Sequence, residues 1–191
     1  MKHAKAHRED FTWTWVGLAV LSMAWSMAAH HGPADRALLQ WLNGGAEHWR
    51  WWIELLGQLG LGATQWLLLS ALLLRVPQPW AVLSLSLVVC AVSVQLLKYL
   101  LDLPRPLAVL PQDSVQVLGD ALRRRAMPSG HTASAFALLG AMLGLRWRPW
   151  ALATAALMAL AVAWSRVAAG AHWPSDVLAG AALGLACGLV C

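Results

Sequence analysis

The sequence predicts an all-α integral membrane protein, built as a bundle of six transmembrane helices. Three observations support this fold class. Only 12% of the 191 residues are charged, about half the roughly 25% of an ordinary soluble domain. Hydrophobic residues make up 59% of the chain, and six long stretches contain no Asp, Glu, Lys or Arg. This composition excludes intrinsic disorder and disfavours a domain surrounded by water.

The uncharged stretches set the positions of the helices. The first three contain 24, 20 and 22 residues, and a helix of about 20 residues crosses a hydrocarbon core of about 30 Å. The last three, taken as 131–145, 149–165 and 177–191, contain 15, 17 and 15 residues, so we expect them to extend into flanking residues or to be tilted. The predicted spans are 12–30, 55–75, 80–101, 130–146, 149–167 and 174–191.

Residues 1–191 are expected to form one membrane-embedded domain. The first span is longer than the apolar core of a signal peptide and is followed by only a weak cleavage site, so we expect it to be retained. Residues 34–52 have apolar positions at helical spacing and are expected to lie along the membrane surface. The last span ends without a polar tail, which fits either a missing tail or a helix that stops short.

Tryptophans mark the predicted ends of the spans. An alternating path puts five on one side of the membrane (Trp13, Trp15, Trp80, Trp147 and Trp150) and four on the other (Trp49, Trp51, Trp52 and Trp173). Lys and Arg do not fix the orientation, because six fall on the side of the N-terminus and eight on the other.

Other classes of partner fit the composition less well. The three cysteines all lie in apolar runs and do not form a disulfide framework, and no Cys/His cluster suggests a metal. The net charge of +5 is scattered between apolar runs, so we expect no nucleic acid and an anionic lipid bilayer as the partner. The sequence leaves the oligomeric state open.

Polar residues gather at four helix ends that the six-span path places on one face of the membrane. They are Lys98 and Arg105 after the third span, Ser129, Gly130 and His131 at the start of the fourth, Arg166 at the end of the fifth, and His172 and Asp176 at the start of the sixth. Ionisable groups are expensive inside a membrane, which favours a functional role for this set.

This set of residues suits phosphate chemistry. Three cations can hold a phosphate dianion, and Ser129 and Gly130 stand where a helix N-terminus favours an anion. Because His172 and Asp176 are four residues apart, the carboxylate can accept from Nδ1–H and leave Nε2 free to attack phosphorus. His131 can then give a proton to the leaving group and later activate water. No step requires a metal or another cofactor.

The same residues carry a family resemblance. Lys98-x6-Arg105-Pro106, Pro128-Ser129-Gly130-His131 and Ser165-Arg166-x5-His172-x3-Asp176 resemble, in order, the three motifs of the type 2 phosphatidic acid phosphatase family. The core of this family is shared with the vanadium haloperoxidases. The resemblance implies that Lys98, Arg105, Ser129, Gly130 and Arg166 bind phosphate. It also implies that His131 is the general acid, His172 the nucleophile and Asp176 its orienting partner.

The resemblance further implies a substrate class and a location. We expect a phosphatase that acts on a membrane lipid phosphate at the periplasmic face of a bacterial inner membrane. Undecaprenyl pyrophosphate is the first candidate substrate, and phosphatidylglycerophosphate, phosphatidic acid and lipid A phosphate remain open. A lipid phosphotransferase and a non-catalytic lipid-phosphate binder or transporter are the alternatives, whereas a soluble haloperoxidase is disfavoured by the apolar runs.

Several polar residues are interpreted as structural. Lys98 and Asp102 could form an ion pair within one helix end, and Arg123, Arg124 and Arg125 are expected to be solvated or to contact headgroups. His30 and His31 are interpreted as incidental loop residues.

Overall fold

The computed structural model describes residues 2–73 and 75–191, and these residues form helices joined by turns and loops, without a β-strand. The helices are α1 (Lys2–Ala29), α2 (Pro33–Asn43), α3 (Arg50–Leu59), α4 (Gly62–Leu73), α5 (Pro77–Leu101), α6 (Pro106–Val109), the 3-10 turn η1 (Gln112–Ser114), α7 (Gly130–Gly144), α8 (Pro149–Ala168) and α9 (Pro174–Val190). Proline stands within the first two positions of α2, α5, α6, α8 and α9, where its fixed φ angle and missing N–H suit a helix start.

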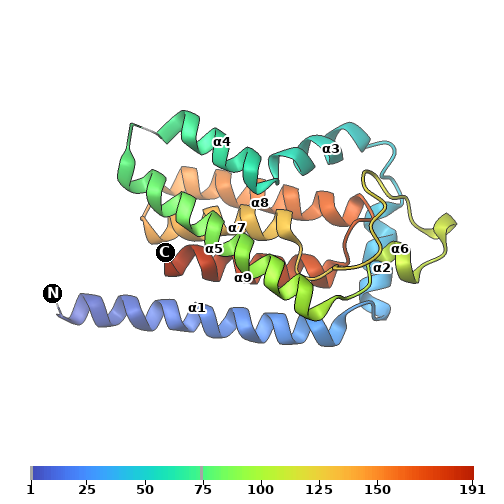
Figure 1. The fold of residues 1–191 in the computed structure, drawn as a ribbon, viewed down its shortest axis with the longest axis horizontal. Coiled ribbons are helices and arrows are strands. Elements are labelled where there is room, and N and C mark those ends of the chain that lie inside the picture. Colours follow the sequence, from blue (N-terminus) through green and yellow to red (C-terminus); the bar gives the residue numbers. More distant parts are fainter. Residues whose placement is uncertain (1, 74) are drawn as a thin grey trace.

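The long helices run side by side along one axis. Figure 1 shows α1, α5, α7, α8 and α9 along the length of the molecule, with α2 and α6 at one end and both chain termini toward the other. α7 contacts α5, α8 and α9, and α1 packs on α9. The ends of α5 and α8 therefore meet the starts of α7 and α9 at the end of the bundle near α2 and α6, as the alternating path predicts.

The predicted span 55–75 is wrong as a single straight helix. α3 begins earlier, at Arg50, and α3 and α4 meet at an angle of 65° across a short break. The cause is the run of glycines around the break, because glycine is a poor helix former and lets neighbouring chains approach. A Cβ on Gly60 would lie 2.7 Å from Val162 and 3.2 Å from His131, and the Gly60 carbonyl accepts a 2.8 Å hydrogen bond from Ser134.

The bundle is that of an integral membrane protein. α5 and α8 are long and apolar enough to cross a bilayer, and the bent pair α3 and α4 meets the same criteria as one span. Trp13–Ala29 of α1 and all of α9 are apolar but shorter, and α7 has 15 residues and is largely buried among its neighbours. Six helical passes thus result if α3 and α4 count as one, which agrees with the predicted bundle.

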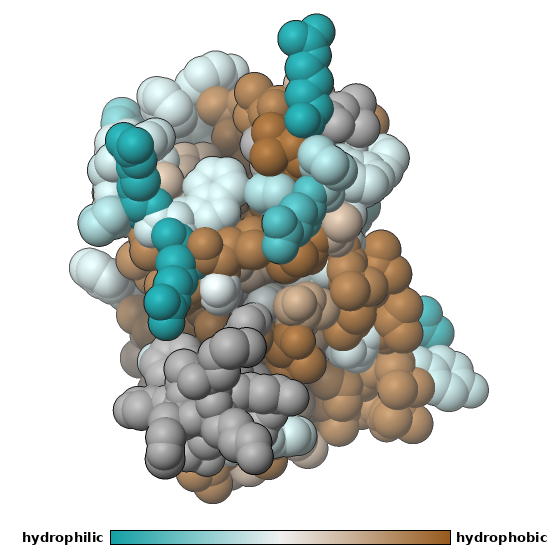
Figure 2. Space-filling view, turned by 90° about the vertical axis from the view of Figure 1, so that its left-hand side faces the viewer, coloured by the Kyte–Doolittle hydropathy of each residue, from teal (hydrophilic) through white to brown (hydrophobic). Residues whose placement is uncertain are grey.

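The surface has the expected distribution of polar and apolar residues. Large hydrophobic side chains such as Leu72, Val92 and Leu157 are exposed along the sides of the helices. Figure 2 shows the end where the termini lie, with hydrophilic residues mainly in the upper part of the view and hydrophobic residues mainly at the lower right. Exposed Arg75, Arg146 and Arg148 belong to the loops at this end, whereas Lys2, Lys5 and Arg8 lie outside the residues whose side chains the structure describes.

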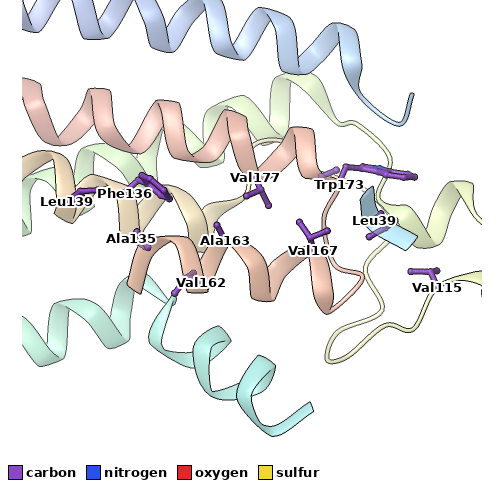
Figure 3. Packing of buried hydrophobic residues seen from close by; sticks show 12 residues of the cluster. Leu39, Val115, Ala135, Phe136, Leu139, Val162, Ala163, Val167, Trp173 and Val177 are labelled. Atoms are coloured by element: carbon purple, nitrogen blue, oxygen red, sulfur yellow. The ribbon is translucent and has the colours of Figure 1, made fainter. Parts of the chain in front are cut away.

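Helix α7 forms the centre of the core. Phe136 and Leu139 pack with Val162 and Val167 of α8 and with Val177 of α9 (Figure 3). The same cluster extends to Leu39 of α2 and to Trp173 in the loop before α9, at the end of the bundle near α2 and α6. The hydrophobic core therefore continues directly into the region that carries the motif residues.

Glycines bring α7 and α9 into unusually close contact. A Cβ on Gly140 would lie 2.6 Å from the Leu185 carbonyl oxygen, and one on Gly180 would lie 2.6 Å from the Ser129 carbonyl oxygen. Gly184 and Gly188 face α7 backbone at even shorter range. Small residues at such contacts let helix backbones approach in a membrane, where van der Waals packing drives association.

We expect Gly140→Ala to destabilise the protein, whereas Gly144→Ala on the same helix should not. The first methyl group would force α7 and α9 apart, at a cost of about 1–3 kcal/mol, while the second meets no atom within 4 Å. Thermal unfolding of both variants in detergent, followed by tryptophan fluorescence, measures the difference. Equal midpoints for the two variants would show that the close contact contributes little.

Candidate functional site

A cavity of about 570 Å³ lies at the end of the bundle where the motif residues meet. Six of the eight predicted site residues line it, namely Lys98, Arg105, Gly130, His131, Arg166 and His172. Ser129 and Asp176 do not line the cavity and are fully buried behind it. The convergence expected from the sequence is therefore present, with two of the residues in a supporting layer.

Arg105 is held by main-chain carbonyl groups. It stands at the N-cap of the short helix α6, and its Nε donates to the Arg124 carbonyl at 3.0 Å while Nη1 donates to the Ala171 carbonyl at 3.2 Å. Its backbone N–H donates to the Arg123 carbonyl at 2.9 Å. The arginine run, predicted to be solvated, thus has exposed side chains but supplies the backbone that orients Arg105.

Arg166 reaches the cavity from the last turn of α8. Its Nη2 donates to the Ile53 carbonyl of α3 at 3.2 Å, and its Nε donates to Ser165 Oγ at 3.2 Å. Gly57 makes room for the guanidinium group, because a Cβ there would overlap Nη2 and lie 3.0 Å from Cζ. The bend between α3 and α4 therefore shapes this part of the cavity.

Lys98 is free of acidic partners. The alternative interpretation, an ion pair with Asp102, is wrong, because Asp102 ends α5 in a left-handed conformation and binds Arg124, with Nε 2.7 Å from Oδ2. The Arg124 side chain lowers the pKa of Asp102 and keeps it ionised. Within the described part of the chain, Lys98 makes no hydrogen bond or ion pair.

The cavity therefore holds three cations without a carboxylate partner. Among the described residues, the ion pairs that involve arginine are Arg50 with Glu47 and Glu54, and Arg124 with Asp102, all at the surface. Lys98, Arg105 and Arg166 contact neutral groups or none. Unbalanced positive charge with fixed N–H donors binds a multiply charged oxyanion such as phosphate.

The His172 and Asp176 pair forms at the start of α9. His172 Nδ1 lies 3.3 Å from Asp176 Oδ2, and the same oxygen accepts the backbone N–H of Trp173 at 2.9 Å. Gly170, with φ of +67°, turns the chain just before His172 where Gln116 leaves no room for a Cβ. Burial, together with the charges of Arg105 and Lys98, lowers the pKa of His172 to about 3, so its ring is neutral at pH 7.

His131 and Gly130 open α7 at the cavity wall. The first N–H groups of a helix have no partner inside the helix, so this terminus can receive an anion. Ser129 occupies the predicted N-cap position, but its side chain does not cap α7. Its backbone N–H donates to the Asp176 carbonyl at 2.9 Å, and its Oγ accepts from Thr132 Oγ1 at 3.1 Å. Ser129 thus joins α7 to α9.

Two predictions about the surroundings of the site are wrong. Trp173 does not mark the membrane interface, because it is fully buried and its Nε1 donates to the Pro104 carbonyl at 3.0 Å. His30 is not an incidental loop residue, because it is buried with its Nδ1 3.3 Å from Asp176 Oδ1. The six-span path puts the end of the first span, where His30 lies, on the same face of the membrane as the motifs. This placement could have indicated from the sequence that His30 lies near the site.

The fold and the cavity define a helical membrane protein whose cavity is lined by three cations and two histidines. Residues 79–191 match the family model of the PAP2 superfamily. The chain therefore belongs to the PAP2 superfamily, which confirms the resemblance carried by the three motifs.

Two crystal structures are similar to this one. LpxE from Aquifex aeolicus is 30% identical, with a TM-score of 0.69 over 81% of this chain and 92% of that chain. A transmembrane PAP2-type phosphatidylglycerolphosphate phosphatase from Bacillus subtilis is 21% identical, with a TM-score of 0.70 over 92% of each chain, and shares the fold. A search of curated proteins found no significant match.

We expect Gly57→Ala to impair the site without unfolding the protein, because the methyl group displaces the Arg166 guanidinium. Removing a preorganised donor costs on the order of 10²–10³ in rate, so the variant should approach the loss caused by Arg166→Ala. Release of phosphate from lipid phosphates measures the effect. Gly45→Ala, whose Cβ would have Trp49 at 4.0 Å as its nearest neighbour, is the control. Wild-type rates for Gly57→Ala would mean that Arg166 does not bind the phosphate.

Proposed function

We propose that this protein is a lipid phosphate phosphatase that works through a phosphohistidine on His172. One observation supports this function above the others. Three cations without acidic partners line a cavity together with a neutral histidine, whose Nδ1 faces a buried carboxylate. This combination provides both a phosphate-binding site and an oriented nitrogen nucleophile.

In the first step of the proposed reaction, His172 Nε2 attacks phosphorus. The P–N bond forms while the bond between phosphorus and the leaving oxygen breaks. His131, at the start of α7 in the cavity wall, gives its proton to that oxygen. Asp176 accepts the Nδ1–H of His172 and stabilises the positive charge that develops on the ring.

In the second step, His131 takes a proton from water. The resulting hydroxide attacks phosphorus, the P–N bond breaks, and its electron pair returns to Nε2. Inorganic phosphate leaves, and both histidines regain their starting protonation states. Each histidine thus acts twice, and no other proton carrier is needed.

Lys98, Arg105 and Arg166 are proposed to hold the three phosphoryl oxygens, with the Gly130 N–H as a further donor. Phosphoryl transfer is catalysed mainly by positioning and by stabilising charge on these oxygens. In nucleotide enzymes much of that charge is balanced by Mg²⁺, whereas here three fixed cations carry it. We therefore propose that the reaction is independent of metal ions.

The substrate is proposed to be a membrane lipid that ends in a phosphate or pyrophosphate. Part of the cavity wall consists of apolar residues of α5, including Leu87, Cys90 and Val94, beside the cations. A headgroup can thus bind while its chains remain among apolar helices. Undecaprenyl pyrophosphate is the first candidate, and we place the whole chain in a bacterial inner membrane with the cavity facing the periplasm.

The central test is phosphate release by purified protein from a panel of lipid phosphates. The panel contains undecaprenyl pyrophosphate, phosphatidylglycerophosphate, phosphatidic acid and lipid A phosphate. We expect turnover of at least one lipid and its loss in His172→Ala, with unchanged thermal unfolding. Full activity of this variant would exclude the mechanism. Transfer of labelled phosphate to a second lipid would indicate a phosphotransferase, and binding without turnover would indicate a binder or transporter.

We expect activity to survive a chelator. The three cations perform the role of a metal in this mechanism, so EDTA should leave the rate within about twofold of its untreated value. The measurement is the initial rate of phosphate release with and without EDTA. Complete loss in EDTA that Mg²⁺ restores would contradict the proposed charge balance.

A further inference from the structure

His30 lies in the supporting layer of the site, although it comes from the opposite end of the sequence. It follows α1 directly and is 7% exposed. Its Nδ1 lies 3.3 Å from Asp176 Oδ1 and 3.4 Å from Ser175 Oγ, and its Nε2 lies 3.2 Å from the Pro104 carbonyl oxygen. The ring thus stands between the start of α9 and the residue that precedes Arg105.

The partners of His30 define its protonation state. The Asp176 carboxylate and the Pro104 carbonyl are both acceptors, and Ser175 Oγ already donates its proton to Asp35 Oδ2. A neutral imidazole has one N–H and one lone pair, so it would place a lone pair against an acceptor. Only the imidazolium, with N–H groups at both nitrogens, satisfies both sides.

The charge of Asp176 leads to the same conclusion. This carboxylate is fully buried, and a buried charge needs a counter-charge. His172 must be neutral to act as a nucleophile, and it contacts only Oδ2. Oδ1 accepts no aligned hydrogen bond in the described part of the chain, and His30 is the group within ion-pair distance of it.

We infer that His30 is a positioning residue which, as an imidazolium, neutralises Asp176 and ties it to the Arg105 loop. The inference rests on the proposed function of His172 and extends it. It assigns a role in the site to the N-terminal helices, which lie outside the region matched by the family model. Asp35 of α2 supports the arrangement, because it accepts the Ser175 N–H at 2.9 Å at the start of α9.

The electrostatics around the ring agree with this assignment. Burial lowers the pKa of His30, but the contact with Asp176, the Pro104 carbonyl and the charge of Asp35 outweigh it and raise the pKa above its ordinary value. The groups that face the ring are Asp176 of α9, Asp35 of α2 and the neighbouring His31, whose ring centroid is 5.1 Å away. The cation is therefore present at low pH and is lost as the pH rises through this raised pKa.

Histidine NMR of the ¹⁵N-labelled protein in detergent tests the charge without using activity. We expect His30 to be more than half doubly protonated at pH 6.5, and to fall below half in Asp176→Asn, because its counter-charge is gone. The His30 signals are assigned by their loss in His30→Gln. A wild-type His30 that is mostly neutral at pH 6.5 would overturn the inference.

Kinetics test the positioning role. His30→Ala should lower kcat by tenfold or more and leave KM within twofold, because His30 does not line the cavity. His30→Gln keeps a donor but carries no charge, so it should recover little of the loss. His31→Ala is the matched control, because His31 is exposed and its backbone rather than its ring binds Asp35; we expect wild-type rates.

The outcomes separate this inference from the proposed function. If wild-type protein hydrolyses lipid phosphates and His30→Ala has an unchanged kcat, or a raised KM alone, the positioning role is wrong while the function stands. If wild-type protein hydrolyses none of the lipids, the proposed function fails, and the NMR titration still decides the charge of His30. If His30→Ala does not fold, His30→Gln and the wild-type titration decide.

Discussion

The repulsion between three cations in one cavity is the constraint on which the rest of the structure depends. In the described part of the chain, Lys98, Arg105 and Arg166 form no ion pair with a carboxylate, although Glu54 and Asp120 also line the cavity, so the fold holds the three cations together against their mutual repulsion. The two arginines are fixed by main-chain carbonyls of Ile53, Arg124 and Ala171. Carbonyl dipoles orient the guanidinium groups without cancelling their charge, which leaves that charge for an anion.

Two of these carbonyl acceptors lie where the chain departs from regular helix, and the third lies within α3. Ile53 lies in α3, shortly before the glycine-rich bend, and its carbonyl is reached because Gly57 leaves space for Arg166. Arg124 and Ala171 belong to the irregular segments before α7 and α9. Helix α3 before the bend and the two loops therefore all support the arginines of the site.

The position of His172, the proposed nucleophile, depends on a different constraint, the close packing of α7 on α9. Gly180 lets the α9 backbone approach Ser129, and the Ser129 N–H binds the Asp176 carbonyl. This contact fixes the starts of the two helices relative to each other, and these starts carry His131 and His172. On the far side of Asp176, the N-terminal helices add His30 and Asp35, so the buried carboxylate is enclosed by three parts of the chain.

The sequence by itself determined the membrane bundle, the family and the set of residues at one end of the helices. These features follow from charge-free runs, from motif spacing and from the alternation of helices across a bilayer, all of which are local or topological. Only the tertiary structure decided that α3 and α4 bend, that Trp173 is buried, that Ser129 lies behind the cavity and that His30 contacts Asp176. Each of these depends on contacts between residues distant in sequence, up to 146 positions apart for His30 and Asp176. The physical reason is that burial and ion pairing arise only when the helices pack together, whereas a helical sequence pattern describes one segment at a time.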